Sequence, residues 1–366
     1  MLLTLPYFAP INALLAYGAQ PIIQALKSTT APPEPQPDRP PLMPKASAFK
    51  TSLISVTCNQ SMNQTMDLDT FASLLPPETK PRTSTSLRGV EIINSASGSI
   101  TGNNDGLRGS GLVSVRLENH GAIRCNNGHG VKLDGDKADE VVNHGLIAGG
   151  NGTALDMGGG NDTLIIKHGS QFHGAVDGGS GTNQVILEDD KGGTFDGAKQ
   201  MQHLWVATGT WTLTGAVEAN QQGKVYSGAT LINHSTIGGS MTVEPDATYS
   251  AGTVANLDVA GTLRMGPATR IDNNLLLQTG STLAFNPSTD KPLSVGNTAN
   301  LSGATLNIHV EDENNLPSRP VRIINAQRVE GQFANVTSNL NNLTPVLTYK
   351  SHDVFVTFKR NEPTPA

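Results

Sequence analysis

The sequence contains little charge, few aromatic residues and no surplus of basic residues. Charged residues make up 15% of the 366 residues and aromatic residues 4%, and 25 Lys and Arg face 31 Asp and Glu. Electrostatic binding of nucleic acid needs a basic patch, which this chain does not provide, so we expect no nucleic-acid partner. The dominance of Leu, Glu, Lys and Ala that marks helical bundles and coiled coils is also missing.

Cysteines and long apolar runs are scarce as well. The only cysteines are Cys58 and Cys125, without a zinc-binding spacing. They are either two thiols or a disulfide formed in an oxidising compartment, and the sequence leaves both open. Residues 88–358 contain no apolar run of about 18 residues, so no transmembrane helix is expected there.

The first 87 residues differ in composition from the rest. Residues 1–27 are apolar, but prolines interrupt them and no basic start precedes them, which leaves an atypical export signal or a plain leader. Residues 28–87 begin with a proline-rich run between Pro32 and Pro44 and continue rich in Ser, Thr and Pro. We expect this segment to be a linker of low order, so that a disordered Pro-rich leader precedes the folded body.

From about Arg88 onward, short apolar segments alternate with Gly, Asn and Asp. Val113–Leu117 is typical: it alternates apolar and polar residues and follows a Gly-Ser-Gly turn. This pattern predicts many short β-strands and no long helix.

The segments belong to a repeat. Gly98, Gly121, Gly145 and Gly169 are spaced by 23, 24 and 24 residues, and Asn-His precedes the second and third of them. One such unit is too small to bury its apolar face, whereas a stack of units buries a continuous column. The repeat therefore predicts that Ile100, Ile123 and Ile147 line up, and that Asn side chains at one corner form a ladder.

Two stretches resemble the passenger domains of bacterial autotransporters of the pertactin type. The first is Val141–Ile166, VVNHGLIAGGNGTALDMGGGNDTLII. The second is the C-terminal order of segments that resembles the family's folding cap: Gly303–Val310, Arg322–Ala326, Val329–Phe333, Tyr349 and Val354–Arg360. The resemblance covers residues 88–360.

The resemblance implies an all-β fold, a single-stranded right-handed parallel β-helix of roughly ten coils. It places the β-helix passenger at 88–294, a cap at 295–360 and a tail at 361–366. Five apolar residues are expected to close the cap: Ile323, Ile324, Phe333, Phe355 and Phe358. In the family the cap assists folding and precedes an outer-membrane β-barrel translocator, which would follow Ala366 if the gene continues.

Several motifs could carry chemistry, and each also has a purely structural interpretation. Gly158–Leu164 and Gly178–Val185 resemble calcium-binding turns, which makes Asp162 and Asn183 candidate ligands, although structural turns are the favoured interpretation. His120, His144 and His168 recur every 24 residues and could bind a metal or sense pH from one column, or simply occupy polar corners.

Two further groups of residues also have both a functional and a structural interpretation. Gly128-His129-Gly130 and Asp189-Asp190 resemble fragments of a pectin-hydrolase site, but their order along the chain is reversed. Trp205, Trp211 and Tyr226 could anchor a partner, but packing inside the body is favoured.

The expected function is that of a non-enzymatic passenger, displayed on the bacterial surface or secreted after passage through the periplasm. It would be an adhesin or would bind a host or surface protein or glycan, without a cofactor and with no catalytic residues. The segments Glu188–Gln200 and Asn220–Tyr226 are expected to present loops to that partner. The alternatives are a secreted β-helix polysaccharide hydrolase or lyase, and a structural factor for self-association.

Overall fold

The computed structural model describes residues 53–58, 61–68, 89–217 and 222–361. The predicted leader, residues 1–27, lies outside them, as do most of the linker and residues 362–366 of the tail. Within the described residues the protein is all-β, and the only helix is the short 3₁₀ turn η1 (Glu313–Asn315). No helix among these residues is long and apolar enough to cross a lipid bilayer.

The chain divides into two compact units, residues 1–188 with 198–203, and residues 189–197 with 204–366. In the first unit, one sheet contains six parallel strands: β1 (Leu53–Cys58), β4 (Gly89–Asn94), β7 (Ser114–Asn119), β10 (Glu140–Asn143), β12 (Thr163–Ile166) and β14 (Gln184–Glu188). A second sheet contains eight: β2 (Ser61–Met62), β3 (Met66–Asp67), β5 (Ser99–Gly102), β6 (Leu107–Gly109), β8 (Ala122–Cys125), β9 (Val131–Leu133), β11 (Leu146–Asp156) and β13 (Gln171–Asp177).

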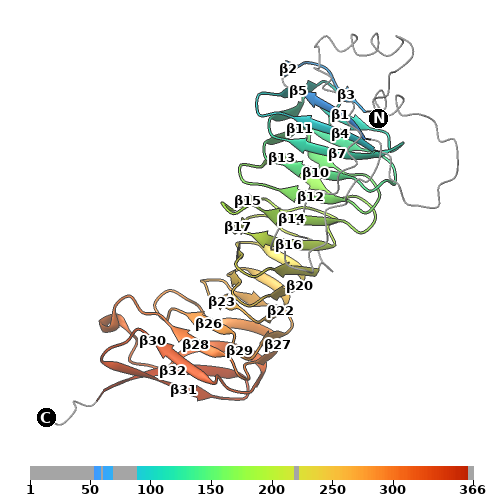
Figure 1. Ribbon diagram of the computed structural model, residues 1–366. Helices are drawn as coiled ribbons and strands as arrows, with labels where there is room; N and C mark the ends of the chain where they lie inside the picture. The colour runs from blue at the N-terminus through green and yellow to red at the C-terminus, as the bar shows by residue number, and fades with distance from the viewer. Residues whose placement is uncertain (1–52, 59–60, 69–88, 218–221, 362–366) are drawn as a thin grey trace, which may run out of the picture. The chain divides into compact units, whose positions relative to one another are not determined.

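The second unit contains two groups of parallel strands, each belonging to one sheet. The first contains β16 (His203–Thr208), β18 (Gln222–Val225), β20 (Thr236–Val243), β22 (Thr253–Val259), β24 (Arg270–Ile271), β25 (Leu275–Leu277), β27 (Leu293–Asn300) and β29 (Val321–Glu330). The other contains β15 (Gly193–Phe195), β17 (Thr210–Leu213), β19 (Thr230–Asn233), β21 (Thr248–Ser250), β23 (Thr262–Arg264), β26 (Thr282–Phe285), β28 (Thr305–Ile308) and β30 (Asn335–Ser338). Each strand pairs with the strand of the neighbouring repeat, which gives a solenoid-like arrangement within each unit (Figure 1).

Register follows the repeat. Ile100 pairs with Ile123 and Ile123 with Ile147, and all three side chains are fully buried. The predicted apolar column is therefore confirmed. Because strand side chains alternate between faces, many strands bury every second residue and expose the others, as in β19 and β26.

A ladder of asparagines lines one corner of the first unit. Asn94 Nδ2 donates to Asn119 Oδ1 at 2.8 Å, and Asn119 Nδ2 donates to Asn143 Oδ1 at 2.8 Å. All three residues are fully buried. An amide both donates and accepts, so it can continue such a chain through any number of coils. The predicted ladder is confirmed.

The structure differs from the sequence expectation at the start of the body. Strand β1 lies inside the segment 28–87, for which we expected low order, and pairs over its whole length with β4, from Leu53 opposite Gly89 to Cys58 opposite Asn94. Strands β2 and β3 pair with β5 and β6 in the same way. The repeat therefore begins before residue 88. The composition of the segment does not reveal this, because the strand-forming run lies in a stretch that is rich in Pro and Ser on average.

The C-terminal end changes from parallel to antiparallel pairing. Strand β29 pairs with β32 (Asp353–Arg360), which pairs with β31 (Leu343–Tyr349), both antiparallel. Of the five expected cap residues, Ile323, Ile324 and Phe333 are buried, whereas Phe355 and Phe358 are only partly buried. The residues of β32 that are fully buried are Val354 and Val356.

The buried amide ladder predicts a large effect of Asn119→Ala. The substitution removes two buried amide hydrogen bonds and leaves only longer ones, from Asn94 Nδ2 to the Ala122 carbonyl and from the Gly145 N–H to Asn143 Oδ1, both at 3.3 Å. We expect a loss of about 1–3 kcal/mol for the two bonds together. Chemical denaturation followed by circular dichroism should show this loss. Asn126→Ala, which removes an amide bonded at an exposed corner, is the matched control. Equal destabilisation by both variants would contradict the role assigned to the ladder.

Candidate functional site

The asparagine corner fixes the backbone of two histidines. Asn119 and Asn143 end strands β7 and β10 in register, and His120 and His144 follow them directly. The backbone N–H of His144 donates to the Asn119 carbonyl at 2.8 Å, which holds the two turns against each other. A Cβ atom on the following Gly145 would lie 2.1 Å from the Gly121 carbonyl oxygen, so only glycine fits after the histidine.

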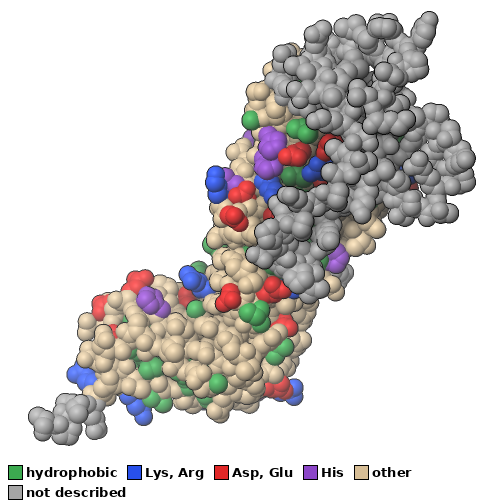
Figure 2. Space-filling model, viewed as in Figure 1, with side chains coloured by type: hydrophobic (Ala, Val, Ile, Leu, Met, Phe, Trp, Pro, Cys, Tyr) green, Lys and Arg blue, Asp and Glu red, His purple; other side chains and the backbone are tan. Residues whose placement is uncertain are grey.

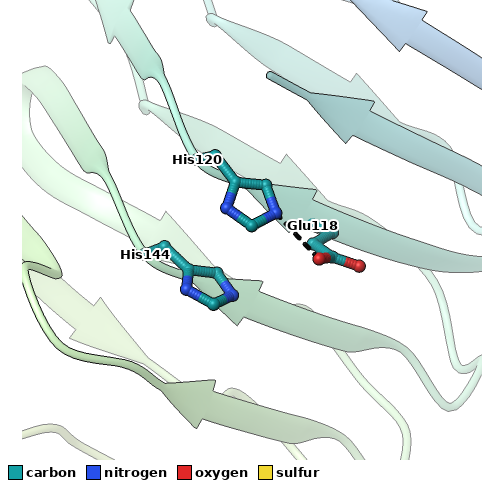
Figure 3. A group of neighbouring side chains, drawn as sticks. All are labelled: Glu118, His120 and His144. Atoms are coloured by element: carbon teal, nitrogen blue, oxygen red, sulfur yellow. Dashed lines mark hydrogen bonds and ion pairs between the residues drawn. The ribbon is translucent and has the colours of Figure 1, made fainter. Parts of the chain in front are cut away.

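The two imidazole rings lie one above the other. Their centroids are 4.2 Å apart with an interplanar angle of 22°, and Nε2 of His120 lies 2.8 Å from Oε1 of Glu118 (Figure 3). Each of the three residues offers one ligand atom, and these atoms all lie within 4.8 Å of one another. His120 is exposed and the other two are partly buried. Figure 2 shows histidine side chains grouped beside acidic and basic ones on the visible face of the first unit.

In the next coil, the position equivalent to His120 and His144 is not that of His168, although the spacing of the histidines indicates it. Asn143 pairs with Ile166, so the position after the asparagine corner falls on Lys167 in the next coil. That coil is one residue shorter at this point than the preceding one. Lys167 Nζ pairs with Glu188 Oε2 at 3.3 Å.

Arg116 organises the carboxylates beside the histidines. Strands β4, β7 and β10 bring Glu91, Arg116 and Glu140 into one row across the sheet. The guanidinium contacts Glu91 at 2.6 Å, Glu140 at 2.7 Å and Glu118 at 3.6 Å. Burial disfavours the charge, but the hydrogen bonds and attraction to Glu140 and Glu91 outweigh it and raise the pKa of Arg116. The row therefore alternates in charge. Together with Glu118, which lies outside the row, three carboxylates surround the single guanidinium.

The two calcium candidates belong to a second buried ladder. Oδ1 of Asp139 accepts from the Val115 N–H, Oδ1 of Asp162 from the Asp139 N–H, and Oδ1 of Asn183 from the Asp162 N–H, at 2.7–2.9 Å. Gln202 Oε1 continues the series by accepting from the Asn183 N–H. The oxygens of Asp162 and Asn183 thus face successive backbone N–H groups, and the two residues serve as links between coils.

Burial changes the protonation of this ladder. Burial raises the pKa of Asp139 to about 8, and the nearby charge of Asp162 also raises it. The hydrogen bond from the Val115 N–H lowers this pKa but does not outweigh burial. Burial likewise raises the pKa of Asp162 to about 7, while the bond from the Asp139 N–H lowers it. The folded protein therefore holds protons on these groups at pH values where ordinary carboxyl groups have lost them.

A third group surrounds His129. Nδ1 of His129 lies 3.0 Å from Oδ1 of the buried Asp105, and Nε2 lies 4.0 Å from Oδ2 of Asp156. The backbone N–H of His129 donates to the same Asp105 oxygen at 3.0 Å. The sequence motif Gly128-His129-Gly130 did not reveal these two carboxylates. Asp189 and Asp190, the other half of the pectin-hydrolase resemblance, belong to the second unit.

The remaining sequence candidates are mostly structural. Trp211 and Tyr226 are buried and pack inside the second unit, while Trp205 is partly exposed beside Tyr226. The expected loops Glu188–Gln200 and Asn220–Tyr226 contain strands β15 and β18, and residues 220–221 lie outside the described residues. Cys58 and Cys125 are both buried and are not joined by a disulfide.

A surface hollow with mixed polar and apolar lining lies on the second unit. It has a volume of about 530 Å³ and is lined by residues that include Arg264, Phe285, Asn286, Asp290, Asn307 and His309. Arg264, Ala284 and Asn307 stand in register on β23, β26 and β28, so the hollow lies on the outer face of that sheet. Guanidinium, amide and carboxylate groups around one hollow suit polar ligands.

In comparisons with known proteins, no protein-family model and no curated protein matches this sequence.

The aspartate ladder predicts a specific pH dependence. Because the folded pKa values lie above the ordinary value of 3.8, the contribution of these two groups to stability is greatest below about pH 4 and declines as pH rises through 7 to 8. Each group contributes at most about 1.4 kcal/mol per pH unit to that slope. Asp139→Asn and Asp162→Asn should flatten it, so that both variants gain stability relative to the parent chain at pH 8.

Urea denaturation between pH 4 and pH 8.5 measures this effect. Asp136→Asn, at an exposed position outside the ladder, serves as the control and should keep the parent slope. A parent chain whose stability rises steadily from pH 4 to pH 8, with no change in either ladder variant, would contradict the protonated state.

Proposed function

We propose that this chain is a non-enzymatic passenger domain of the autotransporter type, built as a single-stranded right-handed parallel β-helix and displayed on or released from the bacterial cell surface. The observation that supports it most is the combination of in-register parallel strands over successive coils with an antiparallel closing hairpin, β31–β32. This matches the order of segments by which the sequence resembles that family.

The closing hairpin has a physical reason in such a protein. A stack of parallel coils ends in unpaired strand edges and an exposed apolar cross-section, which invite aggregation. Antiparallel pairing of β32 with β29 covers the last edge, and Val354 and Val356 bury their side chains there. A passenger displayed at the cell surface benefits from an end that is closed in this way.

The proposed activity is binding of a host or surface glycan or protein. The hollow on β23, β26 and β28 is the best candidate surface, because it places Arg264, Asn286 and Asp290 around one concave site. Sugar hydroxyls and peptide amides bind to groups of this kind.

A display experiment tests the passenger assignment. The chain is fused ahead of an outer-membrane barrel translocator, and surface exposure is followed by antibody labelling and protease resistance on intact cells. We expect a folded, protease-resistant passenger at the surface. Ile324→Asp in the cap should leave a protease-sensitive chain at reduced surface level, whereas Val336→Asp at an exposed position should not. Equal behaviour of both variants would contradict the proposed role of the cap.

A binding experiment tests the activity separately. The purified chain is applied to glycan arrays and to extracellular-matrix proteins, and Arg264→Glu is compared with Arg319→Glu, an exposed residue outside the hollow. We expect saturable binding that falls at least tenfold in the first variant only. Binding that is unaffected by Arg264→Glu would exclude the hollow, and the absence of any binding would contradict the adhesin assignment.

The second candidate, a polysaccharide hydrolase or lyase, is favoured by one observation, the placement of His129 between Asp105 and Asp156. Carboxylates and imidazole can supply acid and base to a sugar bond. Release of reducing ends or unsaturated products from pectin or alginate, lost in Asp156→Asn, would replace the first proposal with this one.

A further inference from the structure

We propose that Glu118, His120 and His144 form a surface binding site for a first-row transition-metal dication of the Zn²⁺ type. The site is independent of the function proposed above. Imidazole nitrogen and carboxylate oxygen are the ligands such ions take in proteins. Two neighbouring coils present them on one face of the first unit, as Figure 3 shows.

The positions of the ligand atoms are close to what an ion requires. Zn²⁺ binds nitrogen at about 2.0–2.1 Å and carboxylate oxygen at about 2.0–2.2 Å, so tetrahedral ligand atoms lie about 3.3–3.5 Å apart. The three candidate atoms lie within 4.8 Å of one another, with the shortest described contact, His120 to Glu118, at 2.8 Å. Side-chain adjustments of about 1 Å therefore convert the observed group into a coordination site.

The rings must also turn. A nitrogen lone pair lies in the plane of its imidazole, and two rings stacked at 4.2 Å and 22° cannot both aim at one ion. Rotation about the final side-chain torsion of histidine is soft, because this torsion has broad minima. His120 has a side chain that is 36% exposed, so it can turn without displacing the interior. Metal binding should therefore open the stack.

The backbone beneath the site is already ordered. Asn119 and Asn143 are buried in the amide ladder, and each immediately precedes one of the histidines. The spacing between coils is set by β7 pairing with β10, with Glu118 opposite Val142. Binding then orders only three side chains, which keeps the entropic cost small.

The surrounding charge favours a dication. Glu91, Glu118 and Glu140 together carry three negative charges around the single positive charge of Arg116. Arg116 contacts one carboxylate oxygen of Glu118, Oε2, at 3.6 Å, whereas the other oxygen, Oε1, lies 2.8 Å from Nε2 of His120. The nearest cation along the column, Lys167, is paired with Glu188.

The donor set also selects among ions. Ca²⁺ takes 6–8 oxygen ligands and Mg²⁺ prefers oxygen in octahedral geometry, and one carboxylate with two imidazoles supplies neither. Three protein ligands leave at least one coordination position for water or for a group from another molecule.

Isothermal titration of the full chain with ZnCl₂ tests the proposal. We expect one saturable site per chain, with loss of binding in both His120→Ala and His144→Ala. Glu118→Gln should weaken binding at least tenfold, because it removes the anionic ligand. His173→Ala, which removes another exposed histidine of the same unit, is the matched control and should bind as the parent does.

Two further readouts separate coordination from nonspecific adsorption. Zn²⁺ should raise the melting temperature of the parent chain and of His173→Ala but not that of His120→Ala, since only a folded-state site shifts unfolding. Lowering the pH to 5 should abolish binding, because protons compete for the imidazole nitrogens. Absence of binding at 25 µM chain and roughly 100 µM Zn²⁺, corresponding to a free energy weaker than about −5.5 kcal/mol, would overturn the proposal. Binding that survives both histidine variants would overturn it as well.

Discussion

Parallel pairing of each strand with its equivalent in the next coil is the constraint on which the rest of the structure depends. Once Asn94, Asn119 and Asn143 share a corner, every residue before and after them is stacked on its counterpart at the spacing of β-strands. Apolar residues then form columns, amides form ladders, and glycine is forced where backbones meet most closely, as at Gly121 and Gly145.

The same stacking decides which charges the body tolerates. Like charges in equivalent positions would lie directly opposite each other, which is unfavourable. The chain avoids most charges, and where it keeps them, Glu91, Arg116 and Glu140 alternate in sign. In the interior, Asp139 and Asp162 occupy equivalent positions, and burial keeps their protons bound, so that each oxygen can accept a backbone N–H without repelling the next. Asn183 fills the following position of that ladder as a neutral analogue.

The repeat could be predicted from the sequence because its period is carried by residues with one physical role each. Asn-x-Gly marked the corner, and the isoleucines marked the interior. What could not be predicted depends on single-residue changes of coil length. His168 has the right spacing from His144, yet the coil between the asparagine corner and Ile166 is one residue shorter, so Lys167 takes the position. Composition does not reveal strand β1, because it lies between the proline-rich run that ends at Pro44 and a Ser- and Thr-rich stretch.

The candidate sites were predictable only in part. Stacking of His120 on His144 follows from their spacing, but the participation of Glu118 depends on a strand residue that no motif marks. The carboxylates around His129 come from two other coils, at Asp105 and Asp156. The aspartate ladder does carry a signal, since Asp139, Asp162 and Asn183 are separated by 23 and 21 residues, which are coil lengths.

Disulfide trapping across two coils tests the stacked register most directly. Thr212 and Ile232 are opposite each other on β17 and β19 and face outward, whereas Thr210 is opposite Thr230. The account predicts that Thr212→Cys with Ile232→Cys oxidises spontaneously to a disulfide, since in-register Cα atoms lie within the bridging range of about 4.4–6.8 Å. It predicts that Thr210→Cys with Ile232→Cys stays reduced, because a two-residue offset places the atoms about 8 Å apart. Efficient bridging of the offset pair, with none of the in-register pair, would contradict the stacking from which the rest is derived.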